Sequence, residues 1–143
     1  MSVRQADPND DRQHTMFSIT FNEKKESILL SVDADGNGTA TMTGKVDSRV
    51  HIYGTPGVHY AIADPVAFTC TATASILWAA VGKHGIYDNR RITLTRKEEG
   101  GLSVAITPGC NADVSLFETT VAADVPVVCK LYRYGGELRV RKE

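Results

Sequence analysis

The feature that most constrains the fold is a strand pattern that recurs from Thr15 to Arg141. Short runs of β-branched and aromatic residues alternate with glycine, asparagine, aspartate and proline, and no long segment carries apolar residues at helical spacing. Alternation of apolar and polar residues is typical of half-buried strands. Turn signals at roughly every eight to twelve residues are typical of antiparallel sandwiches and barrels. The sequence therefore predicts an all-β fold.

Two turns are specific enough to predict hairpins. One is DADGNG at 33–38, and the other is EEGG at 98–101. Asp-Gly and Asn-Gly pairs accept the positive φ of tight hairpin turns. Around 76–78 the pattern favours a strand, with a short helix as the alternative. The strands expected elsewhere are 17–21, 28–32, 39–46, 49–53, 58–62, 66–73, 91–97, 102–107, 114–121, 127–132 and 137–141.

These strands predict a single antiparallel β-sandwich or barrel-like domain of about ten strands at 15–143. The chain has 143 residues, of which 42% are hydrophobic, and this is enough to bury a sizeable core. Residues 1–14 are mostly polar and are expected to form a flexible N-terminal arm. The arm is interpreted either as a frayed end or as a segment that orders against a neighbouring subunit.

The charge balance bears on the class of partner. Sixteen basic and seventeen acidic residues give a net charge of −1, whereas chains that bind nucleic acid through its phosphates usually carry a basic excess. We therefore expect no nucleic-acid partner. The longest apolar run, 76–81, is too short to span a membrane, and MSVRQADPNDDRQH has no apolar core of an export signal. We expect synthesis in the cytoplasm and no membrane partner.

The number and spacing of the three cysteines are consistent with the cytoplasm, where disulfides are rare. Cys70, Cys110 and Cys129 are odd in number and have no CxxC spacing, so they make a poor disulfide framework and a poor zinc site. Cys70 and Cys129 lie inside strand-like runs, and we expect both to be small buried hydrophobic residues. The sequence leaves open whether any two of the three are bonded.

The segment DADGNGT matches the opening of a calcium-binding loop. Asp33, Asp35 and Asn37 supply oxygen atoms at alternate positions. The twelfth position, where such a loop needs a bidentate acid, is Gly44, and the flanks predict strands. We therefore interpret the segment as a hairpin turn, with a weak calcium site as the alternative. No metal or cofactor is expected.

Residues with catalytic chemistry are few. The flanking strands allow His51 and His59 to face each other across a Gly-Pro turn, but there is no HxH or HxxxH spacing to complete a metal site. Cys110 lies in a turn with no base nearby to lower the pKa of its thiol. The chain is therefore expected not to be an enzyme. The alternative is a barrel enzyme in which these groups meet Asp64 or Asp113.

Basic and aromatic residues offer candidate binding surfaces. Alternation places Arg139 and Arg141 on one face of the last strand, as in a guarded edge strand or a surface for an acidic partner. A second basic group comprises Arg90, Arg91, Arg96 and Lys97. Aromatic residues are only 7% of the chain, and Trp78 is expected in the core. The tyrosines, Tyr53 and Tyr60 among them, are candidates for a platform that binds carbohydrate.

A polar segment, Ser2 to His14, ahead of strands that begin at Thr15 resembles the decoration (cement) proteins of tailed-phage capsids. The resemblance is one of architecture and covers the whole chain. It implies a non-enzymatic structural protein of the virion that binds a capsid shell as a homo-oligomer, a trimer or a dimer. The alternative is a β-sandwich module that binds a carbohydrate or another ligand. The partner-binding candidates are Arg4, Asp7, Asp10, Arg12, Arg139 and Arg141.

Overall fold

The computed structural model describes residues 14–21, 26–44, 47–60, 64–82, 85–108, 117–131 and 138–142. Within these ranges every regular element is a strand, which confirms the all-β prediction. None of these residues belongs to a helix that is long and apolar enough to cross a membrane. The strands are β1 His14–Phe21, β2 Glu26–Asp33, β3 Asn37–Thr43, β4 Arg49–Ile52, β5 His59–Tyr60, β6 Val66–Thr69, β7 Thr73–Gly82, β8 Gly85–Arg96, β9 Leu102–Pro108, β10 Phe117–Val121, β11 Val127–Leu131 and β12 Leu138–Lys142.

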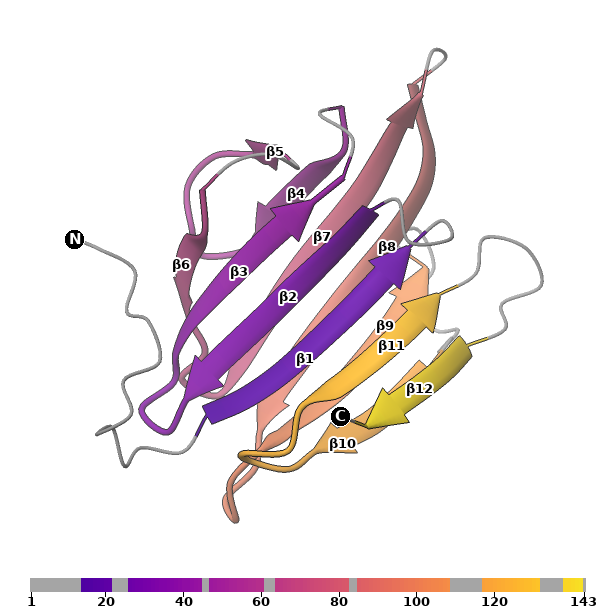
Figure 1. Cartoon of the computed structure of the whole chain (residues 1–143). Helices are drawn as coiled ribbons and strands as arrows, with labels where there is room; N and C mark the ends of the chain where they lie inside the picture. Colours follow the sequence, from indigo (N-terminus) through magenta and orange to yellow (C-terminus); the bar gives the residue numbers. More distant parts are fainter. Residues whose placement is uncertain are drawn as a thin grey trace.

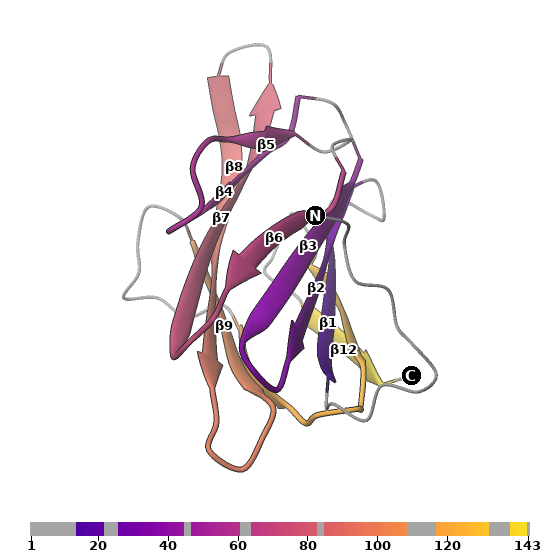
Figure 2. The same cartoon turned by 90° about the vertical axis from the view of Figure 1, so that its left-hand side faces the viewer.

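The strands form two stacked sheets of six strands each (Figure 1). Sheet A has the order β12-β11-β1-β2-β3-β6, and sheet B has the order β10-β9-β8-β7-β4-β5. A view rotated by 90° about the vertical axis shows the two layers side by side (Figure 2). The expected antiparallel sandwich is therefore confirmed, with one exception that the sequence did not indicate. β1 and β11 pair in parallel, with Phe17 opposite Val127.

The core fills the space between the two layers. In β2 every second residue is buried, beginning with Glu26 and continuing with Ile28, Leu30 and Val32. Trp78 of β7 is 2% exposed, so its predicted place in the core is confirmed. Each large side chain buried in this way contributes about 1.5 to 3 kcal/mol to folding. The largest fully buried apolar side chains are Phe17, Ile19, Ile28, Leu30, Ile52, Ile76, Ile92, Leu94, Leu102 and Ile106.

The apolar run at 66–81 is divided between the two sheets. The sequence predicted a strand from 66 to 73, but β6 ends at Thr69 in sheet A and β7 begins at Thr73 in sheet B. Ala72 is exposed. The chain crosses over here because its backbone groups bond to two different hairpins: Cys70 N donates to Gly36 O of the β2–β3 turn at 2.7 Å, and Arg96 N at the end of β8 donates to Ala72 O at 2.9 Å.

Other strand boundaries shift by a few residues. Both predicted hairpins are present, β2–β3 and β8–β9. The ambiguous segment at 76–78 is strand, within β7. β8 begins earlier than expected, at Gly85, and β5 is only two residues long. β1 begins at His14, whose backbone N–H lies 3.3 Å from the Asp124 carboxylate.

Candidate functional site

Exposed large hydrophobic side chains gather at one edge of sheet B. Among the described residues five such side chains are exposed, and three of them, Tyr53, Val58 and Tyr60, belong to the β4–β5 hairpin. They are 45%, 49% and 47% exposed. The loop between them contains Gly54 and Gly57, both with φ near +90° and with open space around the Cα. The hairpin therefore presents its aromatic rings at the surface.

Two arginines lie against these rings. The guanidinium of Arg91, on β8, lies 5.1 Å from the centre of the Tyr53 ring. It also donates to Ser75 Oγ at 3.0 Å and to the Tyr53 hydroxyl at 3.4 Å. Arg49 lies 6.0 Å from the centre of the Tyr60 ring, its register partner on β5. Cation–π contacts of this kind contribute about 0.5 to 1 kcal/mol at exposed positions.

His51 completes this cluster. Its ring meets the Tyr53 ring edge to face, with centroids 4.7 Å apart and planes at 86°. Tyr53 is thereby held between the imidazole of His51, on the same hairpin, and the guanidinium of Arg91 on β8, so its ring is ordered before any partner binds. We call this surface the tyrosine–arginine edge, and it comprises Arg49, His51, Tyr53, Val58, Tyr60 and Arg91.

The edge carries positive charge. On the outer face of β4, β5 and β7, and of β8 from 90 to 96, the charged side chains that the structure describes are Arg49 and Arg91. Tyrosine and arginine are the residues that, with tryptophan, most often dominate the binding energy of protein interfaces. The exposed rings and the two guanidinium groups are therefore of the kind that can contact a partner surface.

His51 and His59 do not meet, so the expectation that they face each other is wrong. Val50, which is buried, pairs with His59 in register. His59 therefore shares the inner face of sheet B with Val50, whereas His51 lies on the outer face with Arg49. The structure consequently assigns the two imidazoles to opposite sides of the sheet. Of the other members of the hypothetical enzyme site, Asp64 is exposed in the segment before β6, whereas Cys110 and Asp113 lie outside the described residues.

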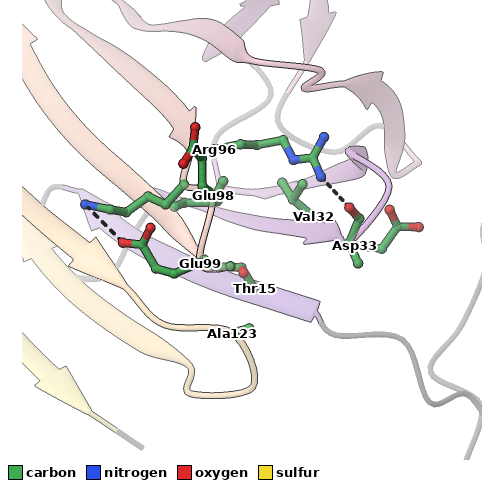
Figure 3. A pocket seen from close by; sticks show the side chains of 12 residues that line it. Thr15, Val32, Asp33, Arg96, Glu98, Glu99 and Ala123 are labelled. Carbon is green, nitrogen blue, oxygen red and sulfur yellow. Dashed lines mark hydrogen bonds and ion pairs between the residues drawn. The ribbon is translucent and has the colours of Figure 1, made fainter.

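A polar cleft of about 200 Å³ opens at the other end of the sandwich, between the two predicted hairpin turns (Figure 3). The Asp33 side chain stabilises the first turn by accepting hydrogen bonds from its backbone. Its Oδ1 accepts hydrogen bonds from Asp35 N at 2.9 Å and from Asn37 N at 3.0 Å, and Gly36 follows with φ +88°. This arrangement confirms the predicted turn at DADGNG. Within the described part of the chain, no three acidic, histidine or cysteine side chains group as metal ligands.

Arg96 connects the two sides of this cleft. Its guanidinium donates to Ala34 O in the β2–β3 turn and, at 3.2 Å, to Thr71 O in the crossover between the sheets. Lys97 and Glu99 in the second turn form an ion pair at 3.8 Å across exposed side chains. The guanidinium therefore joins turns of both sheets, and we assign it a structural role.

The basic residues of β8 do not form one patch. Arg91 lies on the outer face of sheet B, and Arg96 lies at the cleft. Arg90 pairs in register with Trp78, whose side chain is buried. The sequence grouped these residues because they are close along the chain, but strand alternation separates them.

The two described cysteines are buried, as predicted, and neither is bonded. Burial raises the pKa of the Cys129 thiol to about 12. Burial also raises the pKa of Cys70, and the nearby charge of Arg96 opposes this shift in part. Both thiols are therefore protonated and unreactive at neutral pH.

Sequence reasoning missed a buried carboxylate at the opposite end of the sandwich from the cleft. Glu26 and Ser48 are both 1% exposed, and Ser48 Oγ donates to Glu26 Oε2. One signal was present in the sequence: Glu26 is in phase with Ile28 and Leu30, the apolar residues of the same strand. The cross-strand pairs of the tyrosine–arginine edge had no such signal, because they depend on register.

The partner-binding residues expected from sequence are only partly placed. Arg4, Asp7, Asp10 and Arg12 lie outside the described residues. Arg139 and Arg141 lie on β12, which is an edge strand of sheet A, as one interpretation of the sequence expected. In comparisons with known proteins, the chain matches no protein-family model, no curated protein and no solved structure.

Proposed function

We propose that this protein is a non-enzymatic interaction protein that binds a partner protein through the tyrosine–arginine edge. The observation that carries this proposal is the concentration of Tyr53, Val58 and Tyr60 in one hairpin, each close to half exposed. Most soluble proteins carry exposed apolar side chains singly, and a cluster of them marks a binding surface. Arg49 and Arg91 add charge that selects among partners.

The order of the edge supports the proposal. Binding is weakened by the entropy lost when flexible side chains are fixed, at about 0.5 to 1.5 kcal/mol for each side chain. Tyr53 avoids part of this loss because Arg91 and His51 already hold its ring. A rigid aromatic anchor beside a cation is the composition expected at the centre of an interface.

The partner that we favour is a repeated protein assembly such as a capsid shell, as the resemblance to decoration proteins implies. On such a lattice many copies bind side by side, and avidity converts modest single contacts into stable attachment. Arg139 and Arg141 on edge strand β12, and the segment with Arg4, Asp7, Asp10 and Arg12, are candidates for additional contacts. Binding as a dimer or trimer would raise the avidity further.

The test is a comparison of three forms of the full chain as bait, in lysate from the producing cells and with purified shells where these are available. The forms are the wild type, Tyr60→Ala and the control Val125→Ala, which removes an exposed apolar side chain far from the edge. We expect a partner whose affinity falls at least about tenfold for Tyr60→Ala, the effect of losing an interface anchor. Equal binding by all three forms would contradict the proposal.

A second candidate is a carbohydrate-binding module, favoured by the same exposed rings of Tyr53 and Tyr60. Sugar rings stack on exposed aromatic side chains, so the edge offers two platforms. Titration of the purified chain with a panel of oligosaccharides separates the candidates. Saturable sugar binding that Tyr60→Ala abolishes would favour the module over the interaction protein.

A further inference from the structure

Thr15 is a polar residue at an inward position of β1. It is in phase with the buried Phe17 and Ile19, and its register partner on β2 is the buried Val32. Its side chain is only 5% exposed, yet its hydroxyl forms no hydrogen bond within the part of the chain that the structure describes. Buried polar groups are nearly always hydrogen-bonded, so this hydroxyl requires an explanation.

The Thr15 side chain lines the polar cleft between the β2–β3 turn and the β8–β9 turn (Figure 3). The volume of this cleft is about 200 Å³. Sites for drug-sized ligands measure roughly 300 to 1,000 Å³, so this cleft suits one smaller molecule. A threonine hydroxyl is both a donor and an acceptor, and the cleft is where it can meet a ligand group.

The walls of the cleft are ordered by hydrogen bonds within the protein. Gly100 N donates to Lys97 O at 3.0 Å across the β8–β9 turn, and the Arg96 guanidinium donates to Ala34 O in the β2–β3 turn. The two walls are therefore joined in the free protein. A ligand that enters such a site avoids the entropy that would be lost in ordering its walls.

Charged groups of both signs line the cleft. Arg96 and Lys97 are cations, whereas Asp33, Glu98 and Glu99 are anions. A ligand of either charge would meet like charges there. A neutral molecule with several hydroxyl groups can instead accept hydrogen bonds from the cations and donate to the carboxylates.

We propose that the cleft binds a small neutral polyol, of about the size of a monosaccharide. One ligand hydroxyl bonds to the Thr15 hydroxyl, and another donates to the Glu98 carboxylate, which is exposed and has no hydrogen bond or ion pair within the described residues. Hydrogen bonds to an ionised group are roughly twice as strong as those between neutral groups. Arg96 has five N–H donors, and its bonds to Ala34 O and Thr71 O leave others for the ligand.

The experiment is a titration of the isotope-labelled full chain with myo-inositol, D-glucose and D-galactose, followed through the backbone amide signals in NMR spectra. For at least one of the three we expect saturable shifts at Gly100, Gly101 and Ala123, which line the cleft. Glycine and inorganic phosphate are the charged probes. Tighter binding of either probe at the same amides would overturn the assignment of a neutral ligand.

Thr15→Val tests the role of the hydroxyl, because valine keeps the shape of the side chain and removes its oxygen. The hydroxyl has no partner in the described protein, so its loss should leave the melting temperature unchanged or raise it. The affinity for the polyol should fall at least about fivefold, which corresponds to one lost hydrogen bond. A purely structural hydroxyl would give the opposite result, a lower melting temperature and an unchanged affinity.

The matched control is Thr93→Val, at a half-buried threonine on the outer face of sheet B. It should leave the affinity unchanged. The proposal is overturned if no polyol gives saturable shifts at the cleft, if Thr15→Val binds as tightly as the wild type, or if Thr93→Val weakens binding equally. Shifts confined to Tyr53 and Tyr60 would also overturn it. None of the described residues that line the cleft belongs to the tyrosine–arginine edge, so these results do not depend on the proposed function.

Discussion

Ser48 donates a hydrogen bond to the carboxylate of Glu26, and both side chains are excluded from solvent. The glutamate occupies an inward position that Ile28 and Leu30 continue along β2, so a charged group stands where the strand pattern favours an apolar one. A buried polar group is tolerated only when its hydrogen bonds are made. The hydrogen bond from the loop residue Ser48 therefore helps to stabilise the buried carboxylate at the start of β2.

Removing this donor should destabilise the fold. For Ser48→Ala we expect a loss of about 1 to 3 kcal/mol in the free energy of unfolding, because the buried carboxylate loses a partner that water cannot replace. Urea denaturation measures the loss. Ser27→Ala, the same substitution at a half-buried position on the outer face of β2, should change stability by less than about 0.5 kcal/mol. Equal effects of the two substitutions would refute the role of Ser48.

Gly36 is required both for its backbone angle and for space. Its φ is +88°, and a Cβ there would lie 2.4 Å from the carbonyl oxygen of Cys70. Gly54 has a φ of +90° but no atom within 4 Å of such a Cβ. Gly54→Ala should therefore cost only the angular strain, about 1 kcal/mol, whereas Gly36→Ala should cost clearly more. Thermal denaturation of the two variants measures the difference, and equal melting temperatures would show that the clash is relieved without cost.

Arg96 should matter more for stability than its neighbour Lys97. Arg96→Met removes the side-chain donors to Ala34 O and Thr71 O, so that only the backbone bond from Cys70 N to Gly36 O still joins the crossover to the β2–β3 turn, and we expect a cost of about 1 to 3 kcal/mol. Lys97→Met removes only the exposed ion pair with Glu99, and its cost should stay below about 0.5 kcal/mol. Chemical denaturation gives both values. A larger loss for Lys97→Met would contradict the structural role of Arg96.

Cys129 makes stability depend on alkaline pH. Burial raises its pKa to about 12 in the folded protein, whereas in the unfolded chain the pKa is near the ordinary value of 9.0. Above pH 9 the unfolded chain loses this proton while the folded chain keeps it, so stability falls as pH rises from 9 toward 12, by up to about 1.4 kcal/mol per pH unit. Below pH 9 both states keep the proton and the group contributes no slope.

The measurement is the free energy of unfolding of the wild type and Cys129→Ala at several pH values from 8 to 11. The variant is expected to be less stable at pH 8, because it leaves a small cavity, but to lose stability less steeply above pH 9. Parallel curves would mean that the Cys129 thiol is not protected. Mass spectrometry after brief alkylation of the native wild type adds a direct check, since Cys129 should remain unmodified.

The sequence predicted what is local and missed what depends on register. The β2–β3 and β8–β9 hairpins followed from Asp-Gly, Asn-Gly and Gly-Gly pairs, whose backbone preference is intrinsic. The inward place of Trp78 followed from an apolar run. The break at 70–72 did not, because alternation continues through it, and only the bonds to Gly36 and Arg96 place its two sides in different sheets.

In the candidate site, too, the sequence predicted the local features but not the contacts that depend on strand register. Tyr53 and Tyr60 were among the tyrosines considered as a platform, but the contacts with Arg91 and Arg49 join residues of different strands. The expectation that His51 and His59 face each other was wrong for the same reason, because it also depended on strand register. A register shift of one residue exchanges the two faces of a strand, and composition contains no information on register.

The parallel pairing of β1 with β11 has a consequence for how the chain folds as it is made. Phe17 and Val127 are 110 residues apart, like the hydrogen-bonded His14 and Asp124. At roughly 5 to 20 residues per second, the ribosome needs about 5 to 20 s after β1 emerges to deliver its parallel neighbour. Throughout that interval β1 can pair with β2 on one side only, and its other side is an open sheet edge. Until β11 is made, this edge can pair with strands of other chains and so favours aggregation. The last strands of the chain therefore protect the edge that β1 exposes.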